Sequence, residues 1–175
     1  RPAAGRLQRH GLGGGMNIDK SLKAAVTHLE NSLEQAIESG EAECAIAQSS
    51  LRHFFTESID EYGCGTYTRE LTVPKGLVFV GKLHRHSHVA FLLEGEMLVV
   101  SATGKERIKA PHTWVSPVGA KRAFYALEKS ILSTVHITKH LTTDEIDKVE
   151  DELIAPSYES MGLEEPDLSL ILEKT

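Results

Sequence analysis

Between residues 66 and 138 the sequence is divided into short apolar stretches by glycine and proline turns. Tyr67, Leu71 and Val73 alternate with polar residues, which is the period of a half-buried strand. Further stretches of similar length follow, separated by turns that contain glycine, proline or a charged pair. Closely spaced short strands of this kind predict an all-β sandwich or barrel. The expected strands are 66–73, 77–83, 88–93, 96–101, 107–109, 113–116, 122–127 and 131–138.

Helical patterns flank this region on both sides. In residues 19–39 apolar side chains recur at spacings of three and four, and Asp19 and Gly40 are suited to the two ends of a helix. Residues 41–55 are ambiguous, and a second short helix ending near Leu51, Phe54 and Phe55 is our interpretation. After the strands, a capping box at 142–145 opens a helix that is expected to end near Pro156.

These patterns divide the chain into four parts. We expect a leader-like or tag-like flexible segment at 1–15, an N-terminal helical segment at 16–60, a barrel at 61–140, and an acidic C-terminal helix and tail at 141–175.

Three histidines stand at alternate positions at the entrance to the expected strand 88–93. On a regular strand His84, His86 and His88 would share one face. Three imidazoles on one face cost desolvation and conformational entropy unless they bind something. The run therefore predicts a site either for a divalent metal, which binds neutral imidazole, or for an anion, which binds imidazolium.

Two turns within residues 66–138, Glu94-Gly95-Glu96 and Pro117-Val118-Gly119, are similar to the end of the first motif and the start of the second motif of a known family. On these turns, residues 66–138 resemble a cupin, a small double-stranded β-helix barrel of jelly-roll-like form. The motifs Gly-Lys-x-His-x-x-x-His, Arg-Ile-Lys-Ala-Pro and Lys-Arg-Ala also resemble those of small uncharacterised cupin-like proteins of bacteriophages. With the flanking helices, the expected fold is an all-β cupin barrel that carries an N-terminal and a C-terminal helix. The resemblance implies no particular function.

The ligand positions depart from the cupin pattern. Counting from the motif glycines, the resemblance puts Lys82 and His84 at the first two histidine positions and His88 at the carboxylate position. It puts Arg122 at the third histidine position. The four-ligand metal site that the resemblance would imply is therefore not carried over intact.

A metal at His84 and His88 needs a further ligand, for which His136 and His86 are candidates. Zn, Ni, Fe or Mn would suit such a set. We expect strand 131–138 to pair with strand 122–127 across the turn between them. That pairing puts Val135 rather than His136 opposite Arg122, so that either a bulge would be needed or Arg122 would point elsewhere.

Lys82 and Arg122 point to a different site. Two cations beside His84 and His88 would repel a metal ion and attract a carboxylate or phosphate. Acidic side chains of the chain itself could pair with these cations instead, and the candidates are Glu70, Glu96 and Glu106.

Three functions stay open on the sequence. The first is a small-molecule-binding cupin with a divalent metal in its barrel. The second is a metal-free pocket in which Lys82, His84, His88 and Arg122 bind an anionic metabolite or nucleotide. The third is a non-catalytic structural or interaction protein, encoded by a phage. No residue set identifies a catalytic group or a substrate.

Charge is concentrated at the two ends of the chain. Residues 144–175 contain eleven acidic residues and two lysines, residues 1–15 contain three arginines and no acid, and the part between is neutral overall. Without a basic stripe we expect no nucleic-acid partner, and no apolar run reaches the roughly 20 residues of a membrane helix. Cys44 and Cys64 indicate reduced thiols rather than a disulfide framework. We expect a cytoplasmic homodimer, in the host cytoplasm if a phage encodes it.

Overall fold

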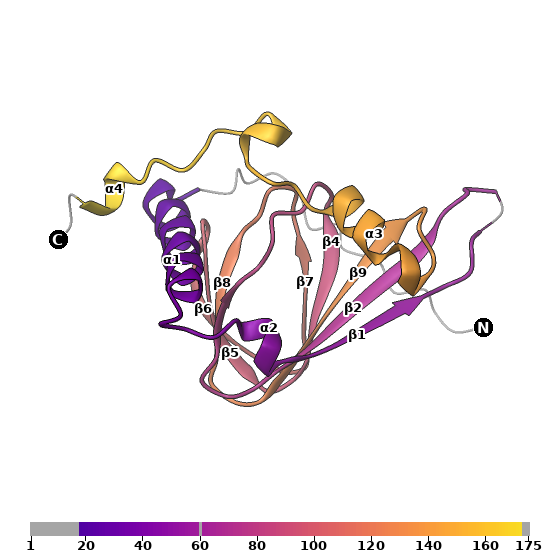
Figure 1. Cartoon of the computed structure of the whole chain (residues 1–175), viewed down its shortest axis with the longest axis horizontal. Helices are drawn as coiled ribbons and strands as arrows, with labels where there is room; N and C mark the ends of the chain where they lie inside the picture. Colours follow the sequence, from indigo (N-terminus) through magenta and orange to yellow (C-terminus); the bar gives the residue numbers. More distant parts are fainter. Residues whose placement is uncertain (1–17, 60, 173–175) are drawn as a thin grey trace, which may run out of the picture.

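Alternating apolar and polar residues produce two facing antiparallel sheets in the computed structural model, which describes residues 18–59 and 61–172 (Figure 1). The segment 1–15 lies outside the described residues. The sheets form a jelly-roll-like barrel, so the expected all-β fold class is confirmed. The first sheet has the order β1 (Ser50–Phe55), β2 (Gly65–Val73), β9 (Ser130–Thr138), β4 (His88–Glu94) and β7 (His112–Ser116). The second has the order β3 (Val78–Val80), β8 (Arg122–Ala126), β5 (Glu96–Ser101) and β6 (Gly104–Lys109).

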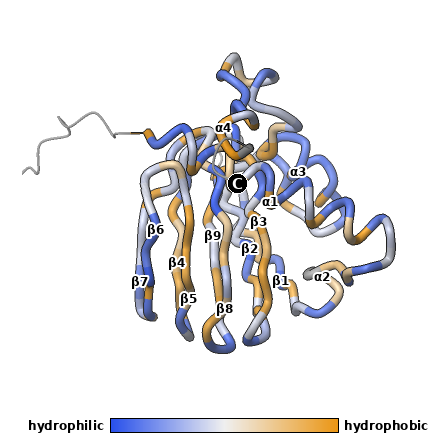
Figure 2. The backbone as a smooth tube through the Cα atoms, turned by 90° about the vertical axis from the view of Figure 1, so that its left-hand side faces the viewer, coloured by the Kyte–Doolittle hydropathy of each residue, from blue (hydrophilic) through white to orange (hydrophobic). Residues whose placement is uncertain are grey.

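The core lies between the two sheets, near one end of the barrel. Inward-facing side chains from both sheets meet there, because every second residue of a strand points to the same face. Figure 2 shows hydrophobic stretches along the strands and hydrophilic residues in several of the turns that join them. The buried members of this cluster are Leu71, Val73, Leu92, Met97, Val99, Ile108, Phe124 and Ala126.

Toward the other end of the barrel, the inward-facing side chains of paired strands change from apolar to polar. Between β2 and β9, residue 71 lies opposite residue 132, residue 69 opposite 134, and residue 67 opposite 136. These pairs are Leu–Leu, Arg–Thr and Tyr–His. The same gradient occurs between β4 and β7, where Ala90 lies opposite Trp114 and His88 opposite Ser116. One end of the barrel is thus closed by aliphatic side chains, and the other presents polar groups.

The helix α1 (Lys20–Glu38) packs against β3, β5 and β8 of the second sheet, as the N-terminal helix that the sequence predicts. The carboxylate of Asp19 accepts hydrogen bonds from the amides of Ser21 and Leu22, at 2.9 and 3.1 Å, and so caps the helix. Ala24 and Val26 are its buried residues. None of the described helices is long and apolar enough to cross a membrane.

The second short helix that we expected within 41–55 forms, but it ends earlier than Leu51, Phe54 and Phe55. A single helical turn, α2 (Ala45–Gln48), is followed by the strand β1, which pairs with β2 and alternates between exposed and half-buried residues. Packing against a neighbouring strand therefore decides the structure of Ser50–Phe55, and the barrel begins inside the segment 16–60 that we expected to be helical. The third strand is also shorter than predicted, since β3 covers only part of 77–83.

The C-terminal helix is confirmed, but its predicted capping box does not form. A 3₁₀ turn, η1 (Thr143–Glu145), leads into α3 (Ile146–Leu153). Thr142 caps no backbone amide, and its hydroxyl donates instead to the Glu145 carboxylate at 3.3 Å. Beyond α3 the described chain contains a second 3₁₀ turn, η2 (Glu159–Met161), and a short helix, α4 (Ser169–Leu172), in contact with α1.

The helix α3 lies against β9 at the polar end of the barrel. Three contacts fix it to the loop between β3 and β4. The amide of Arg85 donates to the Leu153 carbonyl at 2.8 Å, and the amide of Ala155 donates to the Leu83 carbonyl at 2.8 Å. The Lys82 ammonium pairs with a carboxylate of α3 at 2.7 Å. The C-terminal segment is thereby part of the wall around the barrel mouth.

Candidate metal centre

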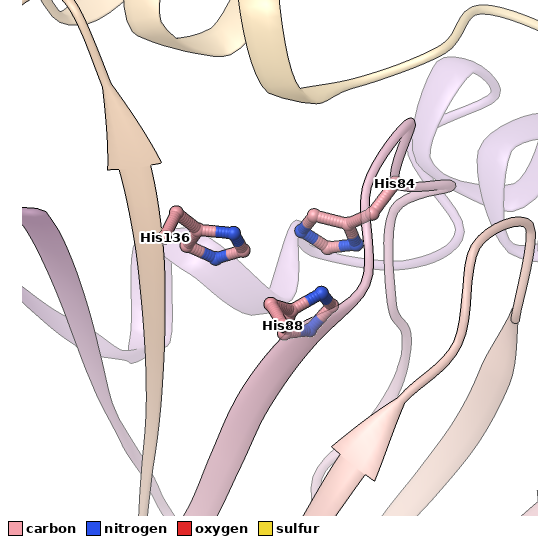
Figure 3. A group of neighbouring side chains, drawn as sticks. All are labelled: His84, His88 and His136. Carbon is pink, nitrogen blue, oxygen red and sulfur yellow. The ribbon is translucent and has the colours of Figure 1, made fainter. Parts of the chain in front are cut away.

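Three histidines from two distant parts of the sequence meet at the polar end of the barrel (Figure 3). His88 is on β4, His136 is on β9, and His84 lies in the loop that precedes β4. The ring centroids are 4.2 Å apart for His84 and His88, 4.5 Å for His88 and His136, and 5.1 Å for His84 and His136. One nitrogen from each ring lies within 4.8 Å of a nitrogen of each of the others. The three side chains can therefore share one small ligand.

Strand register explains why two of these rings meet. On β4 every second residue from His88 to Leu92 is buried and points to the inside of the barrel. On β9, Thr134 and His136 are two residues apart and both line the cavity. Ala90 lies opposite Thr134 where β4 pairs with β9, so the next inward positions bring His88 beside His136.

The third ring is positioned by the backbone of the loop. His84 forms an isolated antiparallel bridge with Ile154, just beyond α3. Its carbonyl accepts a hydrogen bond from the amide of Gly119 at 3.1 Å. The neighbouring Leu83 is buried against Ala155 and Tyr158. His84 is therefore held between the C-terminal segment and the Pro117–Gly119 turn.

Burial keeps the three rings neutral. His88 and His136 are 8% and 6% exposed, and His84 is half-buried. Desolvation, followed by the neighbouring histidines, lowers the pKa of His84 from 6.5 to about 4 and that of His136 to about 3. Desolvation is also the main cause that lowers the pKa of His88. At neutral pH each ring carries a free lone pair, which is the form that binds a metal ion.

Each ring also has a second contact with the protein. His136 Nε2 lies 3.0 Å from the Thr134 hydroxyl, and His88 Nδ1 lies 3.5 Å from the His86 carbonyl oxygen. His84 makes a hydrogen bond with the backbone of Lys82. Partners of this kind orient the imidazole and leave its other nitrogen for a ligand.

The histidines border a cavity of about 170 Å³. Its floor is apolar, whereas its upper wall carries polar and charged groups. The helix α3 and the residue after it contribute to the roof through Val149, Leu153 and Ile154. The floor is lined by Leu71, Leu77, Phe79, Ala90, Phe124 and Leu132. The inside of the barrel is thus not packed solid.

The predicted pairing of the last two strands is wrong, and no bulge is needed for His136. The strand β9 pairs with β2 and β4, whereas β8 pairs with β3 and β5. The turn at Glu128 and Lys129 passes from one sheet to the other instead of forming a hairpin within one sheet. His136 joins His84 and His88, while His86 is exposed and outside this group.

Both predicted cations line the cavity, but they differ in burial and in partner. Lys82 is exposed at the rim and pairs with Glu150 at 2.7 Å. Arg122 lines the cavity and donates from Nη1 to the Ser116 hydroxyl at 2.7 Å. Burial lowers the pKa of Arg122, and the charge of Glu106 opposes this shift. Of the other acidic partners considered, Glu70 pairs with Arg52 and Glu96 with Arg107.

Sequence reasoning missed a second arginine of the cavity. Arg69 lies on β2 between Tyr67 and Leu71 in the same inward-facing series, and it lines the cavity. Its charge contributes to the lowered pKa of both His84 and His136. The sequence could have indicated this, because Arg69 lies two residues from both Tyr67 and Leu71, the apolar residues that predict the strand and its inner face.

The chain matches no family model and no curated protein. Several of the solved structures that are similar to it are cupins by name. KdgF from Halomonas sp. is 18% identical, with 52% of this chain and 96% of that chain covered and a TM-score of 0.38. A cupin superfamily protein from Desulfitobacterium hafniense DCB-2 is 9% identical, with coverages of 49% and 75% and a TM-score of 0.39. Ectoine synthase from P. lautus is 16% identical, with coverages of 58% and 72% and a TM-score of 0.43.

Proposed function

We propose that this protein is a small-molecule-binding cupin that holds a divalent metal ion with His84, His88 and His136. The observation that carries the proposal is the meeting of three neutral imidazoles, each with a nitrogen within 4.8 Å of the others, at the edge of a cavity. Three nitrogen donors with open positions beside them are the ligand set of many catalytic zinc and iron sites.

The donor set fits a metal ion in two further respects. The rings are neutral at neutral pH, so that no proton has to be displaced at a cost. Each ring has a protein contact that restricts its orientation. When bound, such an ion supplies a Lewis acid that polarises or orients a ligand oxygen. The protein's own contribution is to hold the rings, exclude bulk water through α3 and present an apolar floor.

A metal-free anion pocket is the second candidate. It is supported by Arg122, a half-buried cation in the same cavity that forms no ion pair with a carboxylate of residues 18–59 or 61–172. The charge of Arg122 acts on His88 and disfavours a bare metal ion there, and an anionic ligand would reduce that repulsion. The homodimer, the host cytoplasm and the phage origin remain predictions.

Metal analysis of protein purified without chelators tests the proposal. We expect one equivalent of Zn, Ni, Fe or Mn per chain in the wild type, and a loss of most of it in His136→Gln and His88→Gln. The matched control is His86→Gln, which changes an exposed histidine outside the group and should retain the metal. Circular dichroism and thermal unfolding check that each variant is folded.

Two results would refute the metal site. One is a wild-type protein that takes up none of the four ions, either on purification or on incubation with each of them. The other is an equal loss of metal from His86→Gln and from the folded His136→Gln and His88→Gln variants. A folded protein that binds neither metal nor small anions would support a purely structural role.

A further inference from the structure

The cavity contains two guanidinium groups from opposite sheets. Arg69 is on β2 of the first sheet, and Arg122 is on β8 of the second. Both side chains line the cavity that the three histidines border, and both are half-buried. Positive charge therefore faces the cavity from two sides.

Of the other arginines of the described chain, two pair with a carboxylate and one donates to a backbone carbonyl. Arg52 pairs with Glu70, Arg107 pairs with Glu96, and Arg85 donates to the Ile154 carbonyl at 3.0 Å. Within residues 18–59 and 61–172, neither cavity arginine forms an ion pair. Arg122 has only the neutral Ser116 hydroxyl as a side-chain partner there. A half-buried cation that is not paired with a carboxylate is costly, and a bound anion would reduce that cost.

The unused donors of both groups are in contact with solvent. Among the described side chains that are not exposed, no nitrogen or oxygen is both buried and without a hydrogen bond. The guanidinium N–H groups that lack a protein partner must therefore be in contact with solvent, and both side chains line the cavity. A ligand that enters the cavity therefore lies beside two guanidinium groups that have unused donors.

We propose that Arg69 and Arg122 bind the carboxylate of a small acid whose apolar body occupies the cavity floor. A guanidinium presents paired N–H donors that match the two oxygens of a carboxylate. The leucine, phenylalanine and alanine side chains of the floor favour an aliphatic or aromatic body. This inference rests on the proposed function, because the same cavity adjoins the histidine group.

Size and polarity favour a small carboxylate over a nucleotide. The cavity of about 170 Å³ is below the roughly 300–1,000 Å³ of clefts that take drug-sized ligands. A phosphate ester would meet the two arginines, but its sugar and base would need polar partners where the floor offers none. Inorganic phosphate has no apolar body to occupy the floor.

Calorimetric titration with matched acids and amides tests the inference. The probes are acetate, butyrate, hexanoate and benzoate, each compared with its neutral amide, together with inorganic phosphate. We expect at least one of the larger acids to bind and its amide to bind at least about tenfold more weakly, since the amide lacks the charge-assisted bonds. Acetate and phosphate should bind more weakly than hexanoate or benzoate.

Variants of the two arginines give the second readout. Arg69→Gln and Arg122→Gln should each weaken binding of the tightest acid by about tenfold to a hundredfold. Arg122→Lys, which keeps the charge but loses the paired donors, should fall between Arg122→Gln and the wild type. The matched control is Arg107→Gln on the exposed side of β6, which should stay within twofold of the wild type. Thermal unfolding checks that each variant is folded.

Metal content, measured in the same preparations, separates this inference from the metal proposal. Both arginine variants should retain the metal, and the arginine effect should persist in protein stripped with a chelator. The inference is overturned if no acid binds better than its amide, if phosphate binds as well as the tightest acid, or if Arg107→Gln weakens binding as much as the cavity variants. A missing metal with intact acid binding would refute only the metal site.

Discussion

The buried histidines should make the metal-free protein unusually sensitive to acid. In the folded protein the pKa of His136 is about 3, whereas in the unfolded chain it takes its ordinary value of about 6.5. Below pH 6.5 the unfolded chain therefore binds a proton that the folded chain does not. The free energy of unfolding falls as the pH is lowered through 6.5, and this loss continues down to about pH 3.

The size of this effect follows from the two pKa values. The pKa of His136 is about 6.5 in the unfolded chain and about 3 in the folded protein. Lowering the pH from 7 to 5 therefore removes roughly 2 kcal/mol from the free energy of unfolding. His84, with a pKa of about 4, contributes a similar loss of roughly 2 kcal/mol over the same interval. Between pH 7 and pH 5 the His136→Gln variant should therefore lose about 2 kcal/mol less of its free energy of unfolding than the wild type.

Urea unfolding in the presence of a chelator, at pH 7 and at pH 5, measures this difference. Trp114 is the single tryptophan of the chain and lines the cavity, so that its fluorescence can follow the transition. His86→Gln is the matched control and should keep the wild-type pH dependence, because His86 is exposed. The reasoning is refuted if wild type and His136→Gln lose the same free energy between the two pH values.

Three further predictions concern the turn, the cavity wall and the metal. Gly95→Ala should destabilise the protein by at least about 2 kcal/mol in urea unfolding, since Gly95 has φ +85° and a Cβ there would overlap the Lys129 carbonyl oxygen. Tyr67→Phe removes the 2.8 Å bond to His53 Nδ1 and should cost about 1 kcal/mol without a change in metal content. Added Zn²⁺ should raise the melting temperature of the wild type in differential scanning calorimetry, and an equal rise in His136→Gln would contradict the assigned ligands.

Local patterns predicted most of the strands because alternation is a property of neighbouring residues. The strand 96–101 was expected with the bounds that the structure has. The helix at α1 also needed only its own apolar spacing and the cap at Asp19. The strand β1 was missed because its partner β2 decides its conformation, and that pairing is not local. The same limit explains the wrong pairing of β8 with β9.

The histidine group could be predicted in part from the sequence. His84 and His88 were expected to share the barrel interior, because their spacing places them on one face of a strand. His136 was a candidate ligand, but its position beside His84 and His88 depends on how β9 pairs with β2 and β4. Arg69 was accessible to the same alternation argument as Tyr67 and Leu71. It was overlooked because a charged residue in a strand is more often on the solvent side.

The roof that α3 places over the barrel mouth implies that the C-terminal segment takes part in the chemistry of the site. A chain shortened to end at residue 140 would retain all the donor nitrogens but lose Val149, Leu153 and Ile154 from the cavity. Water would then hydrate the imidazoles, and they would regain protons near their ordinary pKa. Trimming this protein to its β-rich portion would thus leave the three histidines in the chain but raise the pH below which they become protonated.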